Sequence, residues 1–155
     1  LECSGRFDLG AAPSAAEFRS RFLDCPSSHS FVLHSGRFPA AFVSFMLVPL
    51  RTPKGCITQA VLHGLAIADD SQVGDVLAST LVRARQCGAA VFNALPLGQC
   101  TQEVLTSLGF DVGDGETFIY AELSPSADGS CVGKLLHERG KQQLRPSNVG
   151  WLPLG

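Results

Sequence analysis

The fold is decided by the stretch from 88 to 123, which reads GAAVFNALPLGQCTQEVLTSLGFDVGDGETFIYAEL. Its pattern predicts a strand, a turn, a short helix, a glycine-rich loop and a second strand. The apolar run at 91–95 is too continuous for a half-exposed strand, so both faces of this strand should be covered. Thr101 is placed to cap the short helix, and Gly109 is its expected stop.

Two polar positions in this stretch are candidates for ligand contact. Asp114 lies between Gly113 and Gly115, so the loop can bring backbone amides and one carboxylate close to a ligand. An aspartate between glycines is also a common turn residue, and the residues alone favour that interpretation. Asn93 sits inside an apolar run and must find hydrogen-bond partners, either within the protein or in a ligand.

Composition and charge limit the class of protein. A chain of 155 residues with 45% apolar and 17% charged residues should form one globular domain over 1–155. A net charge of −2 gives no support for nucleic acid or an anionic membrane as a partner. No apolar run approaches the ~20 residues needed to cross a bilayer, and the first residues lack the features of a signal peptide.

The cysteines indicate a reducing compartment. All six are scattered, without a Cys-x-x-Cys pair or close histidines, which argues against a zinc site. A chain with this apolar content does not need a disulfide framework. We therefore expect reduced thiols and a cytoplasmic location.

The part of the chain before residue 88 predicts two helices and three strands. A capping box at Ser14 and Glu17 predicts a helix over 15–23. Apolar, β-prone runs predict strands at 30–34, 40–48 and 57–67.

Prolines and glycines mark the breaks between these elements. Pro49, Pro53 and Gly55 predict a loop between the second and third strands, and Gly64 either weakens the third strand or marks a bulge. Ser71 is the expected cap of a long helix that Gly88 ends. The residues predicted to form the buried face of this helix are Val73, Val76, Leu77, Thr80, Leu81 and Ala84.

After residue 123 the pattern becomes weaker. The segment 124–143 is rich in Ser, Gly and charge and is expected to be an exposed insertion, and 149–154 predicts a last short strand. The whole order of elements predicts an α/β (α+β) fold, a mixed and largely antiparallel sheet flanked by helices.

The opening stretch also carries a family resemblance. The segments Val91-Phe92-Asn93-Ala94-Leu95, Leu108-Gly109-Phe110 and Gly113-Asp114-Gly115, followed by Tyr120, resemble the C-terminal half of N-myristoyltransferase. That enzyme transfers a tetradecanoyl chain from coenzyme A to an N-terminal glycine. The resemblance extends from Arg6-Phe7-Asp8-Leu9 to Arg145-Pro146-Ser147-Asn148-Val149-Gly150, nearly the whole chain. It implies a fold of the GCN5-related acyltransferase type, two copies of which build the enzyme.

The resemblance implies a peptide-binding site and a base. The family uses the carboxylate of its terminal residue to take a proton from the substrate's glycine ammonium, which implies this role for Gly155. The positions implied to bind the substrate are Ser44, Leu62, Asn93, Gly113, Asp114, Gly115 and Leu154. The role of Ser44 rests almost wholly on the resemblance.

The implied partners are peptides that start with glycine and the N-terminal half of the enzyme, on the same or a separate chain. That half, which this sequence lacks, is implied to hold the co-substrate myristoyl-CoA, so no cofactor is expected on this chain. The same half would supply backbone amides that polarise the thioester, each worth on the order of 10²–10³ in rate. This chain alone is therefore expected to be inactive.

Departures from the family leave an alternative open. Leu62 and Leu65 stand where the family has groove tyrosines, which favours a divergent, non-catalytic module for binding or structure. A stand-alone acetyltransferase is a third reading, but its pyrophosphate loop is not visible around 69–74. His63 is expected to be a structural or exposed histidine, since no acid that could orient it lies nearby in the sequence.

Overall fold

The computed structural model describes residues 13–113. The predicted strand at the end of the opening stretch, the insertion at 124–143 and the strand at 149–154 lie outside the described residues. The same holds for four predicted site residues, namely Asp114, Gly115, Leu154 and Gly155.

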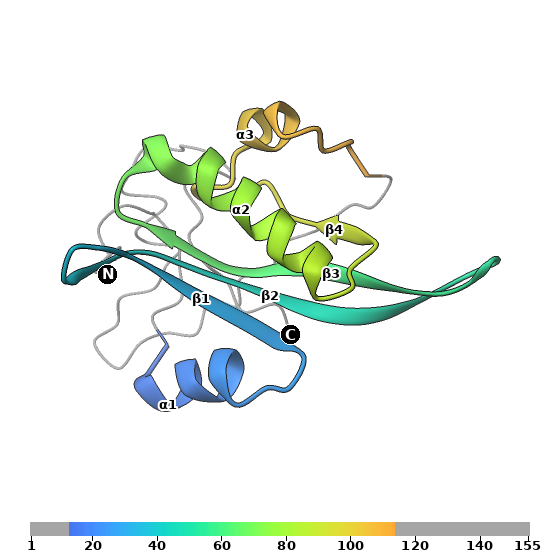
Figure 1. Ribbon diagram of the computed structural model, residues 1–155, viewed down its shortest axis with the longest axis horizontal. Coiled ribbons are helices and arrows are strands. Elements are labelled where there is room, and N and C mark those ends of the chain that lie inside the picture. The colour runs from blue at the N-terminus through green and yellow to red at the C-terminus, as the bar shows by residue number, and fades with distance from the viewer. Residues whose placement is uncertain (1–12, 114–155) are drawn as a thin grey trace, which may run out of the picture.

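The described residues form a four-stranded sheet in the order β1-β2-β3-β4 (Figure 1). The strands are β1 (Ser28–Ser35), β2 (Phe38–Thr52), β3 (Gly55–Ile67) and β4 (Val91–Asn93). The first three pair antiparallel, and β4 pairs parallel to β3 after a helical crossover. The predicted mixed, largely antiparallel sheet is confirmed.

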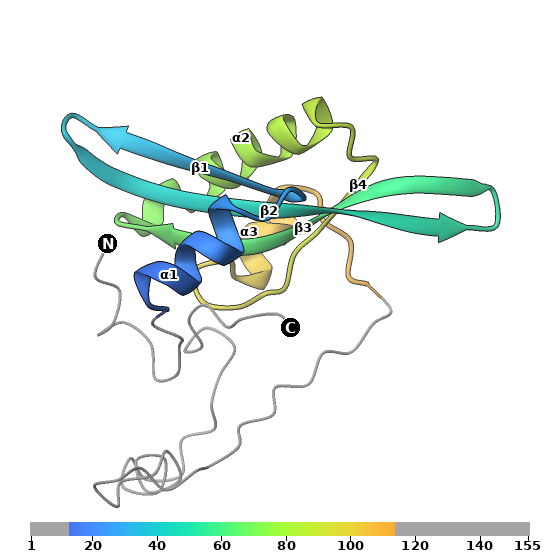
Figure 2. The same ribbon diagram turned by 90° about the horizontal axis from the view of Figure 1, so that it is seen from below.

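Helices cover both faces of this sheet. They are α1 (Ala15–Phe18), the π-helical turn η1 (Arg19–Leu23), the 3₁₀ turn η2 (Asp70–Gln72), α2 (Val73–Gln86) and α3 (Gln102–Ser107). Figure 2 shows α1 on one side of the strands and α2 on the other. Leu105 of α3 packs in the same core cluster as Val76 and Leu77 of α2.

The predicted caps are confirmed for the first and last of these helices. The Ser14 hydroxyl accepts from the Glu17 amide, and the Glu17 carboxylate accepts from the Ser14 amide 2.8 Å away. Thr101 Oγ1 accepts from the Val104 amide, and Gly109 follows α3 with a φ of 82°. Glycine reaches such a left-handed conformation without steric cost, which explains the stop.

The predicted cap of the long helix is wrong. Ser71 does not accept from the helix; its amide and hydroxyl both donate to Asp69 Oδ1, at 3.0 and 2.7 Å. Asp69 is the N-cap of η2, which runs into α2. A carboxylate two residues earlier accepts more strongly than a hydroxyl and converts the expected first turn into a 3₁₀ turn.

The buried face of α2 agrees with the predicted periodicity. Its buried residues are Val73, Val76, Leu77, Thr80 and Ala84. They pack on the side chains of the sheet that face this helix, including Val43 and Ile67 in one cluster and Phe45 in the other.

The hairpin of β2 and β3 is longer than predicted. Pairing continues through Pro49, opposite Thr58, to Thr52, opposite Gly55, so the predicted loop shrinks to a turn at 53–54. Beyond Met46, β2 pairs with β3 alone among the described strands. Its other edge therefore has no strand there to which a backbone N–H must donate. A proline is tolerated in a strand under that condition.

Gly64 marks a bulge, one of its two predicted roles. Ser44 pairs with Gly64 and Phe45 pairs with Leu62, which leaves His63 as the extra residue of β3. His63 and Gly64 both lie on the side of η1: the Phe22 ring is 4.9 Å from the His63 ring and contacts Gly64.

Candidate functional site

A cluster of three serine hydroxyls lies under η1, centred on Ser44. The Ser44 side chain has 0% exposure, and its Oγ lies 3.1 Å from Ser28 Oγ and 2.9 Å from Ser30 Oγ. Ser30 Oγ is also 2.7 Å from the carbonyl oxygen of Phe22. The register of β1 against β2 places Ser30 directly opposite Ser44.

The cluster forms a chain of hydrogen bonds. The Ser30 hydroxyl has one proton and two acceptors within reach, the Phe22 carbonyl oxygen and Ser44 Oγ. Ser44 Oγ is in turn hydrogen-bonded to Ser28 Oγ. Each hydroxyl is satisfied by the protein, so the cluster ties β1, β2 and η1 together and gives Ser44 a structural role in this conformation.

His63 lies on the same side of the sheet and is buried. Burial, and secondarily the positive charge of Arg21, lowers the pKa of this imidazole. The Phe22 ring packs against it at a centroid distance of 4.9 Å. A neutral, buried histidine agrees with the structural role expected from the sequence.

Leu62 and Leu65 do not share a groove with Ser44. Both pack against the core cluster that contains Val76 and Leu77 of α2, on the opposite face of the sheet. Leu62 and Leu65 are separated by three positions and would lie on opposite faces of a regular strand. The bulge at His63 adds one residue and so places both on the same face. The predicted set of peptide-contacting residues is therefore divided between two faces in the described structure.

The predicted burial of the strand that carries Asn93 is wrong, because Asn93 lies at the surface; its expected need for a hydrogen-bond partner is met within the protein. Its Nδ2 donates to Gln59 Oε1 over 2.9 Å, and Val91 is 42% exposed. β4 has three residues and pairs with β3 alone among the described strands, which explains why its outer edge is open. Gly113, the last described residue, is also exposed.

Beyond Val61, β3 and β4 separate. They pair only from Gln59–Val91 to Val61–Asn93. The end of β3 is instead held by a side chain of the following loop, Gln99. Its Oε1 accepts from the Ile67 amide over 2.8 Å, and its Nε2 donates to the Ile67 carbonyl over 2.7 Å.

Gln99 thus replaces a missing strand partner, and it also donates to Asp70 Oδ1 over 2.7 Å. Sequence reasoning missed this residue. A lone glutamine in a loop has no periodicity and no motif, so only the folded geometry reveals what it does.

Carboxylates close the N-terminal end of α2 to an anion. Asp69 accepts from Ser71, and hydrogen bonds from the Ser71 hydroxyl and amide lower its pKa. The Gln72 and Val73 amides donate to the carbonyls of Asp69 and Asp70. Asp75 adds a further carboxylate in the first turn. A helix start normally favours anions, but here the amides of Ser71, Gln72 and Val73 are engaged and the nearby side chains are carboxylates.

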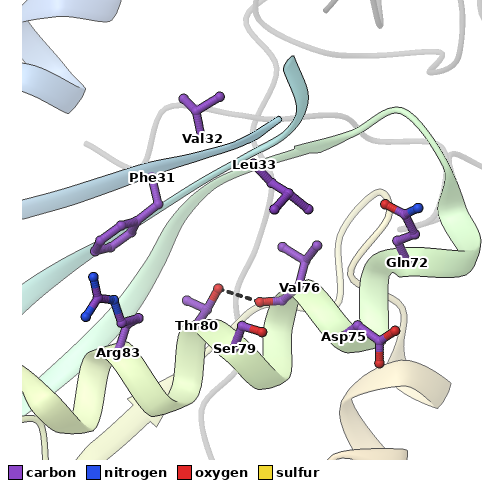
Figure 3. Close-up of a pocket in the computed structure, with 9 residues that line it drawn as sticks. All are labelled: Phe31, Val32, Leu33, Gln72, Asp75, Val76, Ser79, Thr80 and Arg83. Atoms are coloured by element: carbon purple, nitrogen blue, oxygen red, sulfur yellow. Dashed lines mark hydrogen bonds between the residues drawn. The ribbon is translucent and has the colours of Figure 1, made fainter. Parts of the chain in front are cut away.

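A groove of about 480 Å³ runs between β1 and α2 (Figure 3). Phe31 and Leu33 point toward the helix, while Val32 points away. At the floor of the groove, the Thr80 hydroxyl donates to the Val76 carbonyl. Arg83 lies at one end of the groove, over the Phe31 ring. Most of the exposed lining of the groove is apolar.

Within residues 13–113, no group of three or more His, Cys, Asp or Glu side chains could hold a metal ion. None of the helices in this part of the chain is long and apolar enough to cross a membrane.

Comparisons of sequence found no match, either to protein-family models or to curated proteins. Solved structures do match. A transcriptional regulator from Bacillus halodurans C-125 gives a TM-score of 0.58 at 13% identity, covering 70% of this chain and 77% of that one. A putative acetyltransferase from Agrobacterium tumefaciens gives a TM-score of 0.56 at 16% identity, covering 72% and 81%.

An aminoglycoside N-acetyltransferase in complex with CoA gives a TM-score of 0.50 at 17% identity, covering 66% of this chain and 82% of that one. Identities this low bear on the fold alone. The order of strands, the parallel fourth strand and the helices on both faces are therefore those of the GCN5-related acetyltransferase fold.

Proposed function

We propose that this chain is the acceptor-binding half of an acyl-CoA-dependent acyltransferase, and specifically the peptide-binding half of a protein N-myristoyltransferase. Its fold supports acyl transfer in general. The finer assignment is supported by the ordered segments Val91–Leu95, Leu108–Phe110 and Gly113–Gly115. Its partners would be glycine-starting peptides and the N-terminal half of the enzyme, in the cytoplasm.

The observation that carries the acceptor assignment is the closed start of α2. An acyl-CoA carries a pyrophosphate, which needs free amides or cations. Here the amides of Ser71, Gln72 and Val73 have internal partners, and Asp69 and Asp75 surround them with negative charge. The residues present therefore do not fit the pyrophosphate, which favours an acyl-CoA site on another part of the enzyme.

The chemistry assigned to this chain is removal of a proton from the acceptor. An N-terminal ammonium, with a reference pKa of about 7.7–8.0, must lose a proton before its nitrogen attacks the thioester carbonyl. The proposed proton acceptor is the Gly155 carboxylate. The amine then forms an amide bond, the carbon–sulfur bond breaks, and CoA leaves as a thiol.

A second candidate is a non-catalytic binding module. It is favoured by the division of Ser44 and Leu62 between opposite faces of the sheet, because one peptide could not contact both in this conformation. Asn93, at the surface beside Gln59, would remain able to contact a partner.

The test uses the longest native polypeptide that contains this chain. Myristoyl-CoA is supplied with a glycine-starting peptide, with an alanine-starting peptide as matched control, and acetyl-CoA is supplied in parallel. We expect myristoyl transfer to the glycine peptide alone, and its loss when residues are appended after Gly155. Transfer that survives this extension would remove the terminal carboxylate from the mechanism, and no transfer by a folded protein would favour the binding module.

A further inference from the structure

The last turn of α2 brings two side chains against two side chains of β1. The guanidinium carbon of Arg83 lies 5.5 Å from the centre of the Phe31 ring. One turn later, Cys87 Sγ lies 3.8 Å from His29 Nδ1. Residues four apart are neighbours on a helix, and residues two apart share a face of a strand. The register of α2 against β1 therefore gathers a thiol, an imidazole and a guanidinium.

The imidazole is held in place by the sheet. The His29 ring stacks on Phe45 at a centroid distance of 5.3 Å and an interplanar angle of 14°. Phe45 itself has 0% exposure, so it is a fixed platform. A neutral imidazole nitrogen beside a thiol accepts its proton and leaves the nucleophilic thiolate.

The other described cysteines differ from Cys87, which is exposed. Cys100 is buried, and burial raises its pKa to about 11. Cys56 is exposed, but the partner of its sulfur is the Ile57 carbonyl at 3.9 Å, which cannot take a proton. Cys25 is half-buried, and its sulfur lies 3.3 Å from the Ser27 hydroxyl, which is not a base that can take the proton of a thiol.

We propose that Cys87 is a thiol-modification site that forms mixed disulfides with small anionic disulfides. His29 Nδ1 takes the proton of the thiol, and the Cys87 sulfur attacks one sulfur of the reagent. The sulfur–sulfur bond of the reagent breaks, a new one forms to Cys87, and the departing thiolate takes the proton from His29. The disulfide is the oxidant. Arg83, one helical turn away, selects for negative charge on the reagent.

The test compares two probes on the intact chain, glutathione disulfide as the anionic probe and cystamine as the cationic probe. Modification of each cysteine is followed by peptide mass spectrometry, with Cys56 as the internal control. His29→Phe keeps the aromatic stack and removes the proton acceptor, and we expect modification of Cys87 to slow about tenfold while Cys56 is unchanged.

Arg83→Gln isolates the role of charge. At low salt we expect this variant to slow the reaction of glutathione disulfide with Cys87 about threefold. The rate of the reaction with cystamine should not fall. The proposal is overturned if Cys87 in the unaltered chain reacts no faster than Cys56, or if His29→Phe leaves its rate unchanged. Equal effects of Arg83→Gln on both probes would overturn the selection for anions.

Discussion

Replacing Gly64 by alanine would test how η1 packs on the sheet. A Cβ at this position would lie 2.9 Å from Phe22 Cε1 and 3.1 Å from Phe42 Cε1. The Phe22 ring cannot retreat freely, because it packs against Phe18 at 4.7 Å and against Phe42 at 5.2 Å between ring centres. Overpacking of this kind costs about 1–3 kcal/mol. We expect Gly64→Ala to lower the free energy of unfolding by this amount.

Urea unfolding followed by circular dichroism measures the change, and a double-mutant cycle identifies its cause. Phe22→Leu shortens the side chain that Gly64→Ala would meet. In that background the cost of Gly64→Ala should fall, which gives a coupling energy of about 1 kcal/mol. Gly74→Ala is the matched control: its Cβ meets nothing within 4 Å, so it should stabilise α2 by about 0.5–1 kcal/mol.

Two outcomes would refute this reasoning. Gly64→Ala could be as stable as the unaltered chain, which would mean that the two rings yield without cost. It could also be equally destabilising with phenylalanine or leucine at position 22, which would locate the strain in the bulge and not in the aromatic contact.

Three further changes test other parts of the described structure. Gln99→Leu leaves the backbone groups of Ile67 without their side-chain partner, which should cost about 1–3 kcal/mol; unchanged hydrogen exchange at the Ile67 amide would contradict the bridging role. Burial, and secondarily the charge of Arg21, lowers the pKa of His63 in the folded chain. The contribution of His63 to the free energy of unfolding is therefore fully present above a pH of about 6.5. It declines below that pH, because the unfolded chain takes up a proton first. His63→Gln should flatten the fall in urea midpoint between about pH 7 and 5.5, and an unaltered slope would assign that fall to other groups. Cys100, with a pKa raised to about 11 by burial, should react with iodoacetamide only after unfolding, and labelling of the native chain there would show that the core opens.

Much of the fold could be predicted because local signals and burial agree. The capping box at Ser14, the cap at Thr101 and the stop at Gly109 are satisfied by neighbouring residues, so each is visible in sequence. The face of α2 follows from its periodicity. The loop predicted at Pro49 was wrong because a proline is tolerated on a free edge of a strand. The sequence does not show how far β1 extends along that edge of β2.

The candidate site was less predictable because it depends on long-range register. Ser44, Ser30 and Ser28 become one hydrogen-bonded cluster only when β1 and β2 pair in their observed alignment. The bulge at His63 then decides which face Leu62 occupies, and a shift of one residue would have moved it to the side of Ser44. Asn93 was expected to be buried because an apolar run does not reveal that β4 is only three residues long.

The C-terminal end of β3 suggests why this chain would act on the acceptor and not on the acyl donor. At its C-terminal end, Gln99 fills the place of a strand partner at Ile67 and also binds Asp70, so the loop before α2 is fixed. Asp69 accepts from Ser71, so the fixed loop places carboxylates at the start of α2, where a phosphate would need cations or free amides. A positively charged acceptor, such as an N-terminal ammonium, would be attracted to the same surface that repels a pyrophosphate. The negative charge at the start of α2 would therefore favour the acceptor over the pyrophosphate of the donor, in line with the proposed division of the enzyme into two halves.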